Sequence, residues 1–289
     1  MLLFRSSQTR LPYEIFDIGA LLTRPRAENE AIIRGLCNVA YLGDCTALCR
    51  VLGRYKMFAD THDVGLSSHL MLDGYWEMWV TEAIASRIRP GMVVADIGAN
   101  LGYFSLLMAE LVGPGGFLHA FEPNLRMVER LQKSLDVNGF GGRSSVHQVA
   151  LGATDGEPMV FVVPPNEPKN AHMVPLNGDV PNGASLLHTQ TLSGNPDWSE
   201  IEFAKIDVEG AEEVIWSGAH ALLEARKLRT VVLEFTPARY QDAAQFLDRI
   251  LAPGFSLSYI DPHRGITAIS RDELFARNPF EDIMLMLER

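Results

Sequence analysis

The chain has 289 residues, 47% of them hydrophobic, which is enough to fill the core of one large domain with an extension. Its formal net charge of −11 argues against a nucleic-acid partner, which usually meets a basic face. The three cysteines lack zinc-like spacing, and no apolar run approaches the roughly 20 residues of a membrane span. We therefore expect a cytoplasmic protein without a membrane span.

The first part of the chain predicts a helix and two strands. Apolar residues recur at near-helical spacing over 27–40, and 46–52 and 54–59 have the character of strands joined at Gly53. An alternative that stays open is that residues 27–40 form the contact between the two subunits of a homodimer.

An amphipathic helix is expected over 74–88, because Pro90 and Gly91 then give a stop signal and a turn. We place the domain boundary just before this helix. Residues 1–73 are then an N-terminal helix and strand extension, and residues 74–289 are the main domain.

From residue 92 onward the pattern alternates between strands and helices. The expected strands are 92–96, 117–121, 145–149, 158–163, 202–206 and 230–235, and the expected helices are 103–111, 124–137, 211–225 and 237–251. Residues 164–200 are rich in Pro, Asn and Gly and are expected to form a long loop. Short strands at 255–260, 265–269 and 283–287 suggest an antiparallel hairpin at one edge of a mostly parallel sheet.

The most informative stretch is the turn that follows the strand at 92–96. Asp96 ends the strand, and Gly98 and Gly102 punctuate the turn, where a ligand can approach the backbone closely. The spacing is neither the dinucleotide pattern G-x-G-x-x-G nor a phosphate-binding P-loop. An acid two residues before the first glycine suits a cationic ligand, and S-adenosylmethionine (SAM) is such a ligand.

Acidic residues end several of the predicted strands. Asp96, Glu122, Asp207 and Glu234 would meet on one rim of a parallel sheet, where ligands bind in such folds. Glu122 follows the glycine turn by a little over 20 residues, at a place where a carboxylate accepts hydrogen bonds from ribose hydroxyls. This pair does not separate SAM from NAD, because both carry an adenosine ribose.

A second acidic turn spans residues 205–212, Lys-Ile-Asp-Val-Glu-Gly-Ala-Glu. Asp207 and Glu209 can point toward one ligand there. Glu212 and Glu213 are better explained as acids that satisfy unpaired N–H groups at a helix start.

Together these motifs resemble the FkbM-type SAM-dependent methyltransferases over residues 53–287. The resemblance is carried by residues 96–103, Asp-Ile-Gly-Ala-Asn-Leu-Gly-Tyr, by 120–124, Ala-Phe-Glu-Pro-Asn, by 205–212, and by 233–235, Leu-Glu-Phe. It extends to Gly74–Glu77 and to residues 182–186. It implies a Rossmann-like class I fold, an α/β architecture with a mostly parallel seven-stranded sheet, SAM as methyl donor and usually a hydroxyl acceptor.

The same resemblance assigns a donor site. Asp96, Gly98, Ala99, Asn100, Gly102 and Tyr103 would line the methionine end, Glu122 with Pro123 and Asn124 the ribose, and Ala150 and Leu151 the adenine, with Glu77 and Asp207 completing the set of cofactor-binding residues.

For catalysis, Asp207 is the first candidate to position or deprotonate the acceptor, and His188 in the long loop is the second. A magnesium site at Asp207, Glu209 and Glu234 is a further hypothesis, because their strand positions resemble those of metal ligands in catechol-type methyltransferases.

Two rival functions stay open at this point. An NAD-dependent oxidoreductase would share the strand, turn and ribose acid, but it should carry a third glycine where Ser105 stands. A non-catalytic SAM-binding module would not need Asp207. The acceptor is open among the hydroxyls of a sugar, a glycolipid or a secondary metabolite. Residues 164–200 and the N-terminal segment are the expected acceptor-facing parts.

Overall fold

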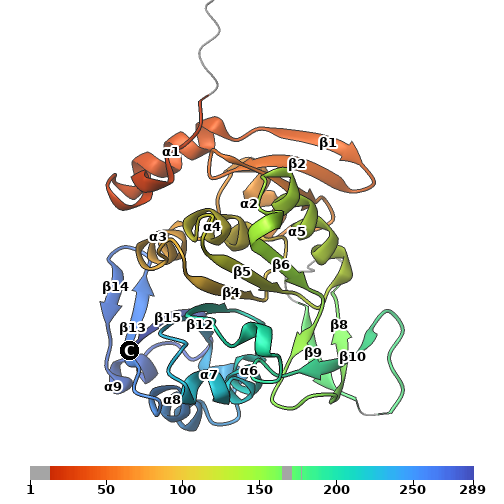
Figure 1. Ribbon diagram of the computed structural model, residues 1–289, viewed down its shortest axis with the longest axis vertical. Helices are drawn as coiled ribbons and strands as arrows, with labels where there is room; N and C mark the ends of the chain where they lie inside the picture. Colours follow the sequence, from red (N-terminus) through yellow and green to blue (C-terminus); the bar gives the residue numbers. More distant parts are fainter. Residues whose placement is uncertain (1–13, 165–170, 177) are drawn as a thin grey trace, which may run out of the picture.

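A computed structural model describes residues 14–164, 171–176 and 178–289. Its centre is an eight-stranded sheet in the order β14-β13-β15-β12-β11-β4-β5-β6 (Figure 1). The strands are β4 (Val93–Ile97), β5 (Phe117–Phe121), β6 (Ser144–His147), β11 (Phe203–Ile206), β12 (Thr230–Phe235), β13 (Ser256–Asp261), β14 (Gly265–Ala268) and β15 (Ile283–Glu288).

The neighbouring strands β6, β5, β4, β11 and β12 run parallel to one another. The strand β15 runs antiparallel to both of its neighbours, β12 and β13. The expected mostly parallel sheet is therefore confirmed. It has one strand more than the seven expected, because β14 extends the edge by pairing with β13. A short helix, α9 (Arg271–Phe275), separates β14 from β15.

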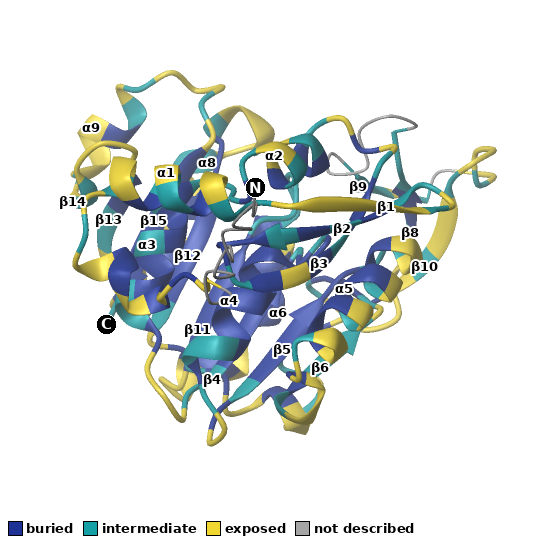
Figure 2. Cartoon of the chain, turned by 90° about the horizontal axis from the view of Figure 1, so that it is seen from above, coloured by how far each residue is buried: buried dark blue, intermediate teal, exposed yellow. Residues whose placement is uncertain are grey.

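Helices cover both faces of this sheet. One face carries α3 (Met78–Arg87), α4 (Tyr103–Leu111) and α5 (Leu125–Val137), and the other carries α6 (Glu212–Gly218), α7 (His220–Glu224) and α8 (Ala243–Leu251). The central strands are buried on both faces, as the burial colours of Figure 2 show. Each face has its own hydrophobic cluster, so the strand ends are fixed on a rigid base. In the described part of the chain, no helix is long and apolar enough to span a membrane.

The N-terminal part forms a separate three-stranded antiparallel sheet. Its elements are η1 (Ile18–Leu22), α1 (Arg26–Leu36), β1 (Val39–Gly43), β2 (Thr46–Val51), β3 (Tyr55–Asp60) and α2 (Leu66–Leu72). The helix expected over 27–40 ends at Leu36, because Cys37 adopts an extended backbone. The strand β1 was not predicted, since its residues are exposed on both faces and show no apolar alternation (Figure 2).

The expected long loop over 164–200 is wrong. Within its described residues it contains β9 (His172–Pro175) and β10 (Ser185–Gln190). They join β7 (Ala150–Leu151) and β8 (Pro158–Val162) in a four-stranded sheet of order β7-β10-β8-β9. The high content of Pro, Asn and Gly concealed these short strands, which depend on pairing between distant segments rather than on a strong local pattern.

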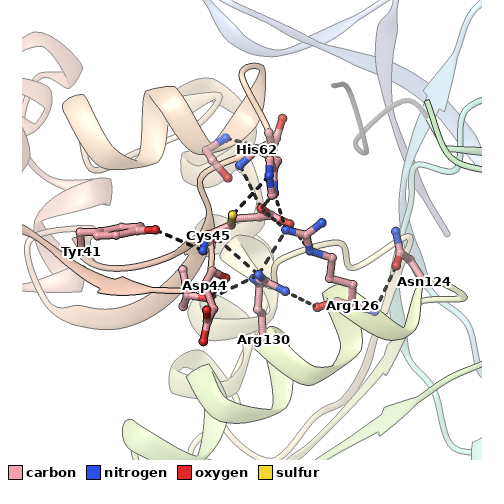
Figure 3. A network of polar contacts seen from close by, with 11 residues as sticks. Tyr41, Asp44, Cys45, His62, Asn124, Arg126 and Arg130 are labelled. Atoms are coloured by element: carbon pink, nitrogen blue, oxygen red, sulfur yellow. Dashed lines mark hydrogen bonds and ion pairs between the residues drawn. The ribbon is translucent and has the colours of Figure 1, made fainter. Parts of the chain in front are cut away.

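A buried carboxylate joins the N-terminal sheet to α5. Asp60, at the end of β3, is fully buried, and its Oδ2 lies 2.6 Å from Nε of Arg126 and 3.7 Å from Nη2 of Arg130. Arg126 also donates to Nδ1 of His62 at 2.7 Å, and Nε2 of that histidine lies 3.2 Å from Sγ of Cys45 (Figure 3). Side chains from α5, from the end of β3 and from the turn before β2 thus meet in one polar network.

This network predicts a large loss of stability for Asp60→Asn. The variant leaves the guanidinium of Arg130, which is 8% exposed, without its anionic partner, and we expect the free energy of unfolding in urea to fall by about 3 kcal/mol. The control is Lys227→Met, which removes an ion pair between two exposed side chains, Lys227 and Glu200, and should change it by less than about 1 kcal/mol. Equal losses of unfolding free energy in the two variants would contradict a stabilising role for the buried carboxylate of Asp60.

Candidate active site

A cavity of about 210 Å³ lies at the carboxyl ends of β4, β5, β11 and β12. Its walls include the turn after β4, the ends of the next three strands, and residues of α2 and β9 from outside the central sheet. Open α/β sheets bind ligands at this edge. Three of the residues that line it, Glu77, Asn100 and Glu209, have a positive φ, at 36°, 50° and 56°. Such backbone strain in non-glycine residues gathers at functional sites.

The turn after β4 is packed so tightly that only glycine fits at its first position. Gly98 has a φ of +77°, and a Cβ placed on it would lie 1.9 Å from the carbonyl oxygen of Asp207. The N–H groups of Gly98 and Ala99 both donate to the carbonyl of Phe121 at 3.0 Å. At the second glycine, Gly102, a Cβ would lie 2.2 Å from a methyl group of Leu131.

Glu122 is held by the backbone on both sides of its carboxylate. Its Oε2 accepts from the N–H of Asn100 at 2.9 Å, and its Oε1 accepts from the N–H of Asn124 at 2.8 Å. Burial raises the pKa of Glu122 to about 7, although these two hydrogen bonds act in the opposite direction. Each oxygen keeps a second lone pair, so the fixed carboxylate can still accept from two hydroxyl groups.

A buried lysine lies between two acids at the junction of β4 and β11. Lys205 is 2% exposed, and its Nζ lies 2.8 Å from Oδ2 of Asp207. Burial disfavours its charge, but the neighbouring carboxylates of Asp207 and Asp96 outweigh burial, and the net effect raises the pKa of Lys205. The ammonium also lies 4.9 Å from the ring centre of Phe104.

Near the ends of β11 and β12, one arginine pairs with three carboxylates that line the cavity. Arg239 contacts Glu209 at 2.8 Å and Asp282 at 3.3 Å, and it also contacts Glu234. Burial and the nearby charge of Asp207 raise the pKa of Glu234, although Arg239 favours its ionised form.

A family model described as the methyltransferase FkbM domain matches residues 96–257, more than half of the chain. The chain belongs to the FkbM methyltransferase family. The predicted family and the predicted Rossmann-like class I fold are both confirmed.

Curated relatives match this FkbM chain over a shorter stretch. The protein-L-isoaspartate O-methyltransferase of Aeropyrum pernix is 43% identical over 54 residues, which are 19% of this chain and 21% of the relative. The enzyme of the same name from Methanothermobacter thermautotrophicus is 35% identical over 60 residues, 21% of this chain and 28% of the relative. The chain thus spans less than a third of the length of these relatives.

Solved structures that resemble this FkbM chain are methyltransferases of low sequence identity. The methyltransferase FkbM from Methylobacillus flagellatus is 16% identical, with 70% of this chain and 44% of that chain covered and a TM-score of 0.44. A SAM-dependent methyltransferase from Aquifex aeolicus is 11% identical, with 77% and 93% covered and a TM-score of 0.41.

Most of the predicted donor-binding residues of this FkbM site line the cavity. They are Glu77, Gly98, Ala99, Asn100, Tyr103, Glu122, Pro123, Ala150, Leu151 and Asp207. Three others lie just behind the wall: Asp96 is buried under the turn, while Gly102 and Asn124 are the N-caps of α4 and α5.

The second catalytic candidate, His188, lies outside this cavity. It is exposed on β10 and lines a shallow hollow together with Asp155 and Thr191. It was a candidate because residues 164–200 were predicted to form a long loop that faces the acceptor. The structure keeps Asp207 at the cavity and does not bring His188 to it.

The predicted magnesium ligands are engaged with cations of the protein. Asp207 pairs with Lys205, and both Glu209 and Glu234 pair with Arg239. Among the residues that the structure describes, no group of three His, Cys, Asp or Glu side chains can hold a metal ion. This arrangement does not fit the magnesium site suggested by strand position, which took no account of Arg239.

Several cavity residues were not foreseen from the sequence. Lys205 belongs to the recognised motif, but a lysine inside a strand gave no sign of where its ammonium lies. Phe161 and Met173 line the cavity from β8 and β9, and Leu66 lines it from α2. Only the chain's long-range folding brings these segments to the ends of the parallel strands.

Proposed function

We propose that this protein transfers a methyl group from SAM to a hydroxyl of a small-molecule or glycan acceptor. The observation that carries the proposal is a single cavity in which the tight turn at Gly98, the fixed carboxylate of Glu122 and the acids of β11 and β12 converge. SAM, when bound, supplies a methyl group attached to a positively charged sulfur.

The residues at the cavity suit such a donor. Glu122 has lone pairs left for ribose hydroxyls, and Ala150 and Leu151 offer small and apolar contacts for an adenine. Behind the turn, Oδ1 of Asp96 is buried and has no hydrogen-bond partner among the described residues. Its charge adds to those of Glu77 and Asp207 in the cavity wall, and an acidic wall suits a cationic ligand.

We assign Asp207 the role of accepting the proton of the acceptor hydroxyl. It lines the cavity, and its Oδ2 lies 2.8 Å from Nζ of Lys205, which holds the carboxylate in place. A general base of this kind contributes about 10²–10⁴-fold, and alignment of the reactants contributes the rest. No step in this scheme requires a metal.

The acceptor is proposed to be a sugar, a glycolipid or a secondary metabolite. Trp76, Phe161 and Met173 give the cavity an apolar wall, which suits the face of a sugar ring or an apolar skeleton. The two curated relatives act at oxygen according to their names, which agrees with O-methylation. A cytoplasmic location, a homodimer and a domain boundary at residues 73–74 stay predictions from the sequence.

Calorimetric titration tests the choice of donor. We expect S-adenosylhomocysteine to bind the protein and NAD not to bind, because the turn lacks the third glycine, which in dinucleotide-binding folds lets the helix pack closely against the strand. Binding of NAD without binding of S-adenosylhomocysteine would refute the proposal.

A further inference from the structure

Two buried charged groups face each other across neighbouring strands. Lys205 of β11 is in register with Asp96 of β4, so both side chains leave the same face of the sheet. Oδ1 of Asp96 is buried without a hydrogen-bond partner among the described residues, while its Oδ2 accepts from Ser105 at 2.6 Å. Asp96 is 1% exposed and does not line the cavity, so its charge faces the ammonium of Lys205 rather than a ligand.

The ammonium of Lys205 has N–H donors that lack an acceptor among the described residues. Of its three N–H donors, one is directed to Asp207, the only hydrogen bond of its ammonium to the described residues. Burial is costly for an ammonium group that makes so few hydrogen bonds. Because Lys205 lines the cavity, a ligand can provide the missing acceptor.

The charges of the residues that line the cavity indicate which ligand group binds Lys205. Lys205 is the one Lys or Arg among the described residues that line the cavity, whereas Glu77, Glu122 and Asp207 are acidic. A carboxylate in this part of the cavity therefore has a single cation to bind, while an ammonium group beside it meets acids. An α-amino acid carries both groups on one carbon, and the methionine moiety of SAM has this structure.

We propose that the ammonium of Lys205 binds the α-carboxylate of the methionine moiety of the donor. The inference rests on the proposed function, since it takes SAM as the donor. It gives the lysine of the second motif a role in binding, in addition to holding Asp207. The pKa of Lys205, which its acidic neighbours raise, keeps the ammonium charged throughout the neutral range.

The first test needs no variant. The wild-type affinity for S-adenosylhomocysteine is compared by calorimetry with that for its decarboxylated form, which lacks only the α-carboxylate. We expect the intact ligand to bind about 10–100-fold more tightly, the range for a hydrogen bond between charged groups. Equal affinities would overturn the proposal. If neither ligand binds, the proposed function itself fails, which is a distinct result.

The second test assigns the preference to Lys205. The double variant Lys205→Met with Asp207→Asn removes both members of the buried ion pair, so neither charge is left without the other, and Asp207→Asn alone is the matched control that keeps the ammonium. We expect the preference for the carboxylate to fall to about onefold in the double variant and to persist in the control. A double variant that melts cooperatively and keeps the full preference would show that another group binds the carboxylate.

Discussion

Gly98→Ala is expected to weaken binding of S-adenosylhomocysteine by more than about 100-fold. The added Cβ would lie 1.9 Å from the carbonyl oxygen of Asp207, a backbone atom that cannot rotate away, so the turn must move. That turn carries Asn100, whose N–H fixes the carboxylate of Glu122, and it abuts the end of β11. One methyl group therefore disturbs the binding surfaces on β4, β5 and β11 together.

The matched control is Gly139→Ala. Gly139 has the same φ of +77°, but a Cβ there has no atom within 4 Å. It therefore reports the cost of a left-handed alanine alone, about 1–2 kcal/mol of stability, without a clash at the cavity. We expect the control to bind the ligand like the wild type. If Gly98→Ala also binds normally, the turn does not have the role assigned to it.

Donor affinity is expected to depend on pH through Glu122. Ribose hydroxyls donate best to the ionised carboxylate, and burial raises the pKa of Glu122 to about 7 in the free protein. Below that pH the ionised fraction falls about tenfold per unit, so affinity for S-adenosylhomocysteine should fall with it. Above about pH 8 the carboxylate is almost fully ionised, and this dependence should disappear.

The variant Glu122→Gln tests whether Glu122, rather than another titrating group, causes the pH dependence of affinity. The variant should bind about 10–100-fold more weakly at pH 8, and its affinity should change little between pH 8 and pH 5.5. Glu129→Gln, at an exposed position of α5, should keep the wild-type pH dependence. A wild-type dissociation constant that is the same at pH 8 and pH 5.5 would contradict the ribose-binding role of Glu122.

The parallel strands and the helices between them could be predicted because each segment carries its own sequence signal. The strand Phe117–Phe121 and the helix Tyr103–Leu111 have the predicted bounds, since each is a dense apolar segment ended by glycine or proline. The donor side of the cavity could be predicted for the same reason. Gly98 and Glu122 lie in short motifs whose geometry depends on few other residues.

The wall from β8 and β9, which we propose faces the acceptor, could not be predicted, because it is assembled from distant segments. The strands β9 and β10 are held by pairing with β7 and β8, so their sequences carry little signal of their own. This pairing places Met173 at the cavity and His188 on an exposed strand.

The acids at the strand ends show a second limit of sequence reasoning. Glu234 was predicted at the rim and Glu209 in the second acidic turn, and both line the cavity. Their partner, Arg239, follows in a short 3-10 helix, η5 (Pro237–Arg239), and no motif indicated that it folds back onto both. The sequence predicts which groups meet at an edge more readily than how their charges are paired.

The most direct measurement of the central claim is a sequential titration of the wild-type protein. NAD is added first, and S-adenosylhomocysteine is added to the same sample afterwards. We predict no heat of binding for NAD, followed by saturable binding of S-adenosylhomocysteine at one site per chain. Saturable binding of NAD that blocks S-adenosylhomocysteine, or no binding of S-adenosylhomocysteine, would contradict a methyl-donor site at Gly98 and Glu122.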